Sequence, residues 1–167
     1  MPGRWVRFHG LPGSKRYPDD ESEYREVLTR HNTILRELAG PGSKVVLLTT
    51  GYSESPEPSG RPPELVDLDG DATPWRTLAM HAINGEDDPC YWHVYAGVRE
   101  WRRGGLDTIF RLVADDVISN VMIVSPRCRW LLHPYDGGMD VIAGSPGACR
   151  RLKRKYAPWL SSRPDGL

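Results

Sequence analysis

Residues 129–144 read Arg-Trp-Leu-Leu-His-Pro-Tyr-Asp-Gly-Gly-Met-Asp-Val-Ile-Ala-Gly. Two apolar runs flank the triplet Asp136-Gly137-Gly138, which supplies the residues that a tight hairpin turn needs where φ is positive. We therefore expect two antiparallel strands, over residues 129–134 and 139–143. Hairpins of this kind outnumber helical crossovers along the chain, which favours an antiparallel or mixed sheet.

The segments around this hairpin continue the pattern. Residues 121–125 are a short apolar run that predicts one more strand directly before it. Ser145 and Pro146 are a typical N-cap and first-turn pair, so a final helix should follow, and Pro158 should kink it or end it early. Further upstream, Asp107 follows two glycines and can cap a second helix.

The first half of the chain contains the clearest helix. Asp20 can cap it, Glu23 lies three residues later, and apolar residues recur at helical spacing until Gly40 stops it. An aromatic and branched run over residues 4–9 predicts a strand before this helix. The continuous apolar core of residues 44–50 predicts a buried strand after it.

Residues 75–83 and 90–98 complete the set of expected strands and are joined by a turn-forming connection. We predict a single α+β domain over residues 1–167, with a mostly antiparallel or mixed sheet of about six to seven strands and three helices packed on it. Residues 53–73 differ from the rest because proline and acidic residues dominate them. They should form a mobile surface loop within the domain.

Composition and charge restrict the function classes. The 22 basic and 22 acidic residues cancel, so no overall charge directs the chain to nucleic acid or to a membrane surface. The longest apolar runs fall short of the ~18 residues of a membrane span, and the N-terminus lacks the apolar core of a signal peptide. Three widely spaced cysteines do not predict disulfides. We expect a cytoplasmic protein, and the low share of lysine among the basic residues is typical of a G+C-rich bacterial genome.

The late hairpin carries the first group of candidate site residues. His133, Tyr135, Asp136 and Asp140 should project from one tip, and a carboxylate beside an imidazole is a common arrangement for proton transfer. A purely structural explanation fits the same residues, because the turn itself requires Asp-Gly-Gly. We weigh the structural explanation more heavily, and the functional one favours recognition over catalysis.

A second group lies in and before the glycine-containing loop that follows the first strand. Arg7, Lys15 and Arg16 supply positive charge beside a freely turning backbone, which suits an anionic ligand, and His9 begins the loop. The loop is not a Walker motif, because the order Gly-Lys-Ser/Thr is absent. An ordinary solvated turn is the alternative explanation.

Three other histidines are candidate ligands. His31 lies on the apolar side of the first long helix, where a histidine is usually a hydrogen-bonded core residue. A simple hairpin register would place His81 opposite His93, but spacing fixes no third ligand. We therefore predict neither a metal nor a cofactor.

The final helix carries the basic run Arg150, Arg151, Lys153, Arg154 and Lys155. Such a patch can contact a phosphate backbone despite the neutral total charge. Cations also stabilise the C-terminus of a helix, and no aromatic side chains interleave with these. Nucleic-acid binding through this helix is therefore the less favoured partner hypothesis.

The two ends of the chain together resemble an uncharacterised family of small bacterial proteins, domain of unknown function 3885. The resemblance rests on residues 4–18 with the following helix, which contains Arg30-His31-Asn32, and on residues 133–142, and it leaves residues 51–74 unmatched. In place of the family's Asp-Asp-Arg-Gly turn, this chain has Asp136-Gly137-Gly138. The resemblance implies no activity and supplies no catalytic residues.

Two function classes follow. The leading hypothesis is a protein-binding accessory or immunity-type factor, since catalytic motifs are missing and the chain contains six tryptophans and seven tyrosines, which are common interface anchors. The alternative is a hydrolase or phosphate-handling enzyme that uses His133, Asp136 and Asp140 with His9 and Arg7. That alternative requires the first strand and the late hairpin to meet in one cleft. The sequence does not predict an oligomeric state.

Overall fold

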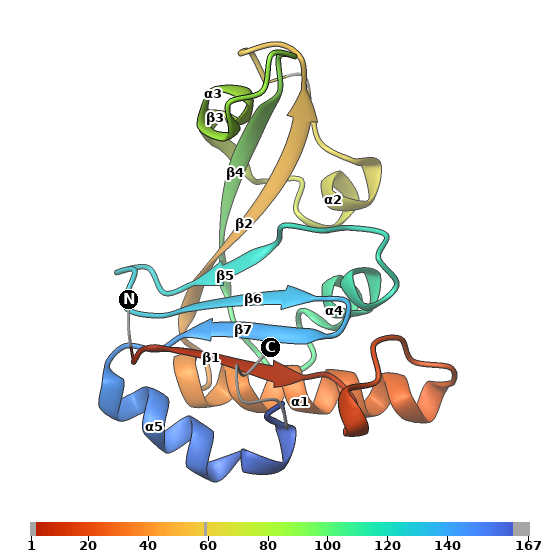
Figure 1. Cartoon of the computed structure of the whole chain (residues 1–167), viewed down its shortest axis with the longest axis vertical. Helices are drawn as coiled ribbons and strands as arrows, with labels where there is room; N and C mark the ends of the chain where they lie inside the picture. The colour runs from red at the N-terminus through yellow and green to blue at the C-terminus, as the bar shows by residue number, and fades with distance from the viewer. Residues whose placement is uncertain (1–2, 59, 162–167) are drawn as a thin grey trace.

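The computed structural model describes residues 3–58 and 60–161, which form one seven-stranded sheet with helices packed on it (Figure 1). The strands follow the order β1-β7-β6-β5-β2-β4-β3 across the sheet, and every pairing between them is antiparallel. The strands are β1 (Trp5–His9), β2 (Lys44–Ser53), β3 (Thr73–Ala79), β4 (Tyr91–Glu100), β5 (Met122–Val124), β6 (Leu131–Tyr135) and β7 (Gly138–Ile142). The α-helices are α1 (Glu21–Ala39), α2 (Pro63–Leu68), α3 (Met80–Asn84), α4 (Asp107–Ala114) and α5 (Pro146–Lys155).

The predicted α+β class is confirmed, and α1, α4 and α5 are the three expected helices. Short helical turns over Pro12–Ser14 (η1) and Ala157–Trp159 (η2) complete the structure. One strand is shorter than expected, because α3 replaces its second half. The backbone amides of Met80 and His81 both point to the carbonyl oxygen of Cys90, and the chain then turns through a left-handed Gly85. A strand cannot continue through such a turn.

The two long terminal helices begin where their capping residues predicted. The Asp20 carboxylate accepts hydrogen bonds from the backbone amides of Ser22 and Glu23 at the start of α1. The Ser145 hydroxyl accepts one from Ala148 at the start of α5, which ends before Pro158. Each cap satisfies amides that the helix itself leaves unpaired.

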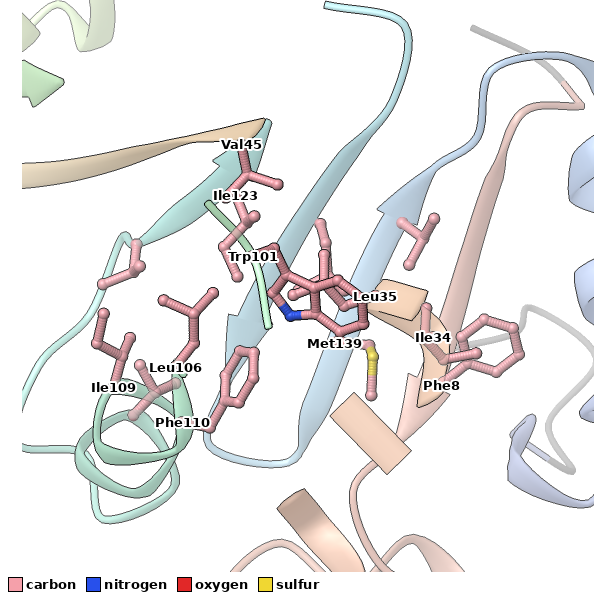
Figure 2. Packing of buried hydrophobic residues seen from close by; sticks show 14 of the residues in the cluster. Phe8, Ile34, Leu35, Val45, Trp101, Leu106, Ile109, Phe110, Ile123 and Met139 are labelled. Atoms are coloured by element: carbon pink, nitrogen blue, oxygen red, sulfur yellow. The ribbon is translucent and has the colours of Figure 1, made fainter. Parts of the chain in front are cut away.

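The hydrophobic core lies between one face of the sheet and the helices α1, α4 and α5. Phe8 of β1, Met139 of β7 and Ile123 of β5 point into it, together with Phe110 of α4 and Ile34 of α1 (Figure 2). Because neighbouring side chains of a strand alternate between faces, the residues between these core positions lie on the opposite face of the sheet. That opposite face carries most of the candidate site.

Residues 53–73 contain structure that the composition did not predict. They include α2, whose Leu65 is buried in the core, and a polar anchor beside it. The guanidinium of Arg61 donates to the backbone carbonyl of Asp69, and the Asp69 carboxylate accepts from Arg99 at 2.7 Å. The second half of the expected loop is therefore packed against β4. The mobility of residues 53–73 remains a prediction.

Candidate functional site

The first strand and the late hairpin lie side by side. In the register of the sheet, Asp140 of β7 pairs with Arg7 of β1 on one side and with His133 of β6 on the other. Directly opposite residues of antiparallel strands share a face of the sheet, so these three side chains lie on the face turned away from the core. Three of the residues that the enzyme hypothesis names, Arg7, His133 and Asp140, therefore lie on one face of the sheet.

Arg7 and Asp140 form a bidentate ion pair. The Nε and Nη2 groups of Arg7 donate to the two carboxylate oxygens of Asp140, each at 2.8 Å. The two side chains are 26% and 21% exposed, so the pair is only partly screened by water. The hydrogen bond to Asp140 raises the pKa of the Arg7 guanidinium above its usual value, despite the opposing effect of burial. Each of the two charges is thus neutralised by a partner within the protein.

Two aromatic rings flank the same guanidinium. The Cζ atom of Arg7 lies 4.8 Å from the centre of the Tyr135 ring and 5.7 Å from that of the Trp5 ring. Cation–π contacts of this kind add to the ion pair in fixing the position of the side chain. We call Trp5, Arg7, His133, Tyr135 and Asp140 the Arg7 patch.

Burial shifts the titration of both Tyr135 and His133 in the Arg7 patch toward the neutral form. Burial raises the pKa of Tyr135 to about 12. Burial also lowers the pKa of His133, although the nearby Asp140 carboxylate acts in the opposite direction. Among the described residues, neither the His133 ring nor the Tyr135 hydroxyl has a hydrogen-bond partner. No hydrogen bond joins His133 to Asp140, so the arrangement differs from a catalytic carboxylate–imidazole pair.

Asp136 has a different role at the tip of the hairpin. It accepts hydrogen bonds from the Arg16 Nε at 2.6 Å and from the Tyr17 hydroxyl at 2.9 Å. Burial alone would raise the pKa of Asp136, but these bonds outweigh burial and hold the pKa below its usual value. Together with the bond from the Gly10 amide to the Gly137 carbonyl, at 2.8 Å, they fasten the loop after β1 to the turn.

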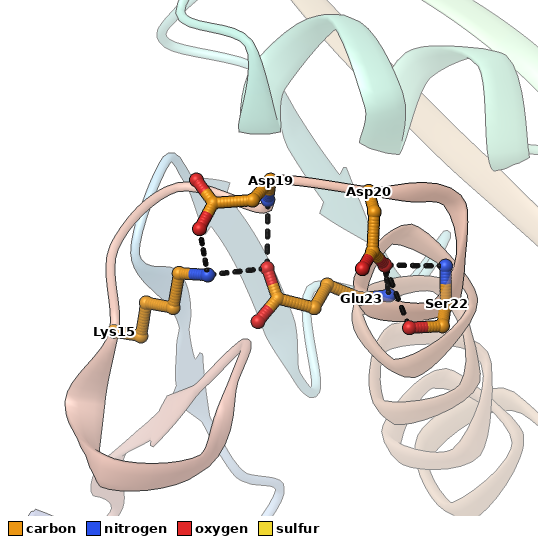
Figure 3. Close-up of polar contacts among 5 residues, drawn as sticks. All are labelled: Lys15, Asp19, Asp20, Ser22 and Glu23. Atoms are coloured by element: carbon orange, nitrogen blue, oxygen red, sulfur yellow. Dashed lines mark hydrogen bonds and ion pairs between the residues drawn. The ribbon is translucent and has the colours of Figure 1, made fainter.

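Lys15 is also neutralised within the protein. Its ammonium group donates to the carboxylates of Asp19, at 2.7 Å, and Glu23 (Figure 3). The Glu23 carboxylate also accepts a hydrogen bond from the backbone amide of Asp19. The bonds to Asp19 and Glu23 raise the pKa of the lysine. Arg7, Lys15 and Arg16, the three cations predicted to bind an anion, therefore each have a carboxylate partner in the chain.

His9 does not join the group around His133. It lines a separate cavity of about 250 Å³ with Leu11 and Trp159. Its Nε2 atom is buried and has no hydrogen-bond partner among the described residues. Burial, followed by the charges of Arg7 and Arg30, lowers the pKa of the ring. The candidate residues are thus divided among the Arg7 patch, the hairpin tip and the His9 cavity, and Lys15 pairs separately with Asp19 and Glu23.

The other histidines are placed by the fold. His31 is buried, and its ring lies 2.8 Å from the Val27 carbonyl, as expected for a core histidine. The expected pairing of His81 with His93 is wrong, because the strand ends at α3 and His93 pairs with Thr77 instead. Within residues 3–58 and 60–161, no group of three potential ligands is arranged to hold a metal ion.

On the final helix, Lys155 forms an ion pair with Glu37 at 2.7 Å, whereas Arg150, Arg151, Lys153 and Arg154 are exposed. None of the described helices combines the length and the apolar character needed to cross a bilayer. Nucleic-acid binding by this helix remains the less favoured hypothesis.

Comparison with known proteins places the chain in a family. The model of the family described as a domain of unknown function, DUF3885, matches residues 1–164. The chain belongs to the DUF3885 family. The match extends beyond the two ends on which the resemblance rested and includes residues 51–74 of this DUF3885 protein. No curated protein and no solved structure matches the chain.

Proposed function

We propose that this DUF3885 protein is a protein-binding accessory or immunity-type factor of the bacterial cytoplasm, and that the Arg7 patch is the centre of its contact surface. The observation that supports this most strongly is the arginine held between two aromatic rings on the face of the sheet turned away from the core. Tryptophan, tyrosine and arginine are the residue types that contribute most binding energy at protein interfaces.

The ion pair makes this surface rigid before any partner arrives. A free arginine side chain loses about 2 kcal/mol of rotamer entropy when it is fixed. In the Arg7 patch, the bidentate bond to Asp140 has already fixed it. A partner therefore meets an arginine that is already ordered, and the entropic cost of association is lower.

The distribution of tryptophans is consistent with this proposal. Trp101 is buried in the core, Trp75 is 62% exposed, and the other four are half-buried. If all six were buried, the aromatic composition would be explained by core packing alone. The half-buried Trp5 lies in the Arg7 patch, whereas Trp75 lies on β3 at the far edge of the sheet.

The proposal is tested by co-purification from the source cells with the wild-type chain, the double variant Trp5→Ala/Tyr135→Ala and the control Trp75→Ala. The control removes a more exposed tryptophan that lies outside the Arg7 patch. Circular dichroism establishes that each variant is folded. A protein retained by the wild type should bind the double variant at least about 30-fold more weakly, as expected for the loss of a hot spot of about 2 kcal/mol, and should bind Trp75→Ala unchanged. Equal loss in both variants, or no retained protein, would contradict the proposal.

The hydrolase or phosphate-handling alternative has one observation in its favour. The neutral His133 lines a cavity of about 200 Å³ with Tyr135 and Asn120. A neutral imidazole with free nitrogens can accept a proton. Turnover of chromogenic carboxyl or phosphate esters that His133→Gln abolishes and Trp5→Ala retains would favour this enzyme over the binding protein. Absence of turnover by the wild type would count against it.

A further inference from the structure

The connection between β5 and β6 is a rigid turn built around one serine. The hydroxyl oxygen of Ser125 accepts hydrogen bonds from the backbone amides of Arg129, at 2.6 Å, and Trp130, at 3.3 Å. The Ser125 carbonyl accepts one from Cys128, whose positive φ of 50° closes the turn. The turn therefore holds the backbone of Arg127 and Arg129 in one arrangement.

This turn forms one wall of a cavity of about 270 Å³ at the end of α1 and the beginning of β2. Three of the lining side chains are cations, Lys44, Arg127 and Arg129, and no carboxylate lines the cavity. Trp130, which is half-buried and packs against the core, supplies an apolar wall. We call the cavity lined by these four residues and Ser125 the Arg127 pocket.

The cations of the Arg127 pocket differ from those of the Arg7 patch. Among the described residues, no carboxylate lies within ion-pair distance of Lys44, Arg127 or Arg129. Like charges gathered around one cavity repel each other, and an anion between them would convert this repulsion into attraction. The cations of the Arg127 pocket are thus available to bind an anionic ligand from outside the chain.

A buried hydroxyl adds a directional donor to these charges. Ser125 is 7% exposed and lines the cavity. Its oxygen accepts two amide bonds, while its own proton has no acceptor among the described residues. A hydroxyl donates one hydrogen bond, so this proton is available to an oxygen atom placed in the cavity.

We propose that the Arg127 pocket binds a small phosphate ester that carries a flat or apolar group. Three cations match a dianion better than a carboxylate, and the arginine fork binds phosphate oxygens in pairs. The Trp130 wall suits the ring of such an ester. The volume lies just below the usual range for ligand pockets, which favours one phosphate with one ring over a dinucleotide.

The proposal is independent of the protein-binding function, and phenyl phosphate is a suitable probe. Titration of the full-length chain, followed by nuclear magnetic resonance, should give saturable shifts at the amides of Lys44, Ser125 and Trp130. The double variant Arg127→Ala/Arg129→Ala should bind at least about tenfold more weakly, because charge-assisted bonds to phosphate are lost. The matched control Arg150→Ala/Arg151→Ala removes the same charge from α5 and should change the affinity by less than about twofold.

Three results would overturn the phosphate-ester site. One is the absence of saturable shifts at the Arg127 pocket. Another is equal weakening in the two double variants, which would reduce the effect to overall charge. The third is binding of phenol alone, or of inorganic phosphate alone, as tight as that of phenyl phosphate, because the pocket would then recognise only one half of the ester.

Discussion

The Arg7 patch and the Arg127 pocket contain the same kinds of side chain, arginine beside tryptophan, and differ in their carboxylates. Arg7 is held by Asp140 through two hydrogen bonds, whereas Arg127 and Arg129 have no carboxylate partner among the described residues. The first arrangement uses its charge inside the protein and presents aromatic surface. The second leaves its charge available.

This difference shows why basic residues in a sequence do not by themselves identify an anion site. The loop after β1 has two cations, as many as the β5–β6 turn, and two glycines where the turn has none, yet Asp19, Glu23 and Asp136 neutralise those cations. The partner of Arg16 lies 120 positions further along the chain. Only the fold reveals such pairing.

The largest effect is expected at Gly138, which pairs with His9 of β1 and with Tyr135 of β6. A Cβ atom there would lie 2.1 Å from the Phe8 carbonyl oxygen, so Gly138→Ala must displace β1. We expect a loss of about 3 kcal/mol in the free energy of unfolding, measured by urea denaturation. Gly13→Ala, at a positive φ with open space around it, should cost about 1 kcal/mol. Equal costs would mean that β1 is not held rigidly against β7.

A second test addresses the environment of Tyr135. Burial raises its pKa to about 12 from the usual 10.0, so its hydroxyl should remain protonated where exposed tyrosines ionise. The ultraviolet absorbance of tyrosinate should therefore differ between the wild type and Tyr135→Phe only at the alkaline end of the titration. If the variant instead lacks a group that ionises near 10, the Arg7 patch is more open to water than the structure indicates.

A smaller effect is expected on acidification. Burial lowers the pKa values of His9, His31 and His133 from the usual 6.5. The unfolded chain therefore binds more protons than the folded chain as the pH falls below 6.5, and stability is lost in that window. We expect the free energy of unfolding to fall by about 1 kcal/mol between about pH 7.5 and pH 5.5. His133→Gln should reduce this fall, and an unchanged dependence would show that His133 does not contribute.

Local patterns predicted most of the architecture. Asp20, Ser145 and the Asp136-Gly137 turn act on neighbouring residues, so their capping and turn-forming effects can be inferred from sequence. The register of β1 against β7 is different, because it joins residues more than a hundred positions apart. The sequence could therefore state that Arg7 and Asp140 would have to meet for the enzyme hypothesis, but it could not show that they do.

The parts that sequence reasoning missed depend on tertiary contacts. Composition marked residues 53–73 as a loop, but Leu65 and the buried pair of Arg61 and Asp69 anchor half of it. The Arg127 pocket was also missed, although the run Arg127-Cys128-Arg129-Trp130 has cations beside an aromatic residue and no nearby acid. That local absence of acidic residues was the available signal.

The ion pair between Arg7 and Asp140 holds the surface of the Arg7 patch together, and a double-mutant cycle measures its coupling energy directly. The cycle uses Arg7→Met, Asp140→Asn and their combination, with Arg16→Met, Asp136→Asn and their combination as the control, since the Arg16 side chain is 65% exposed. We predict a coupling energy of about 2 kcal/mol for the first pair and less than about 1 kcal/mol for the second. A coupling between Arg7 and Asp140 that is near zero, or no larger than that between Arg16 and Asp136, would contradict the account.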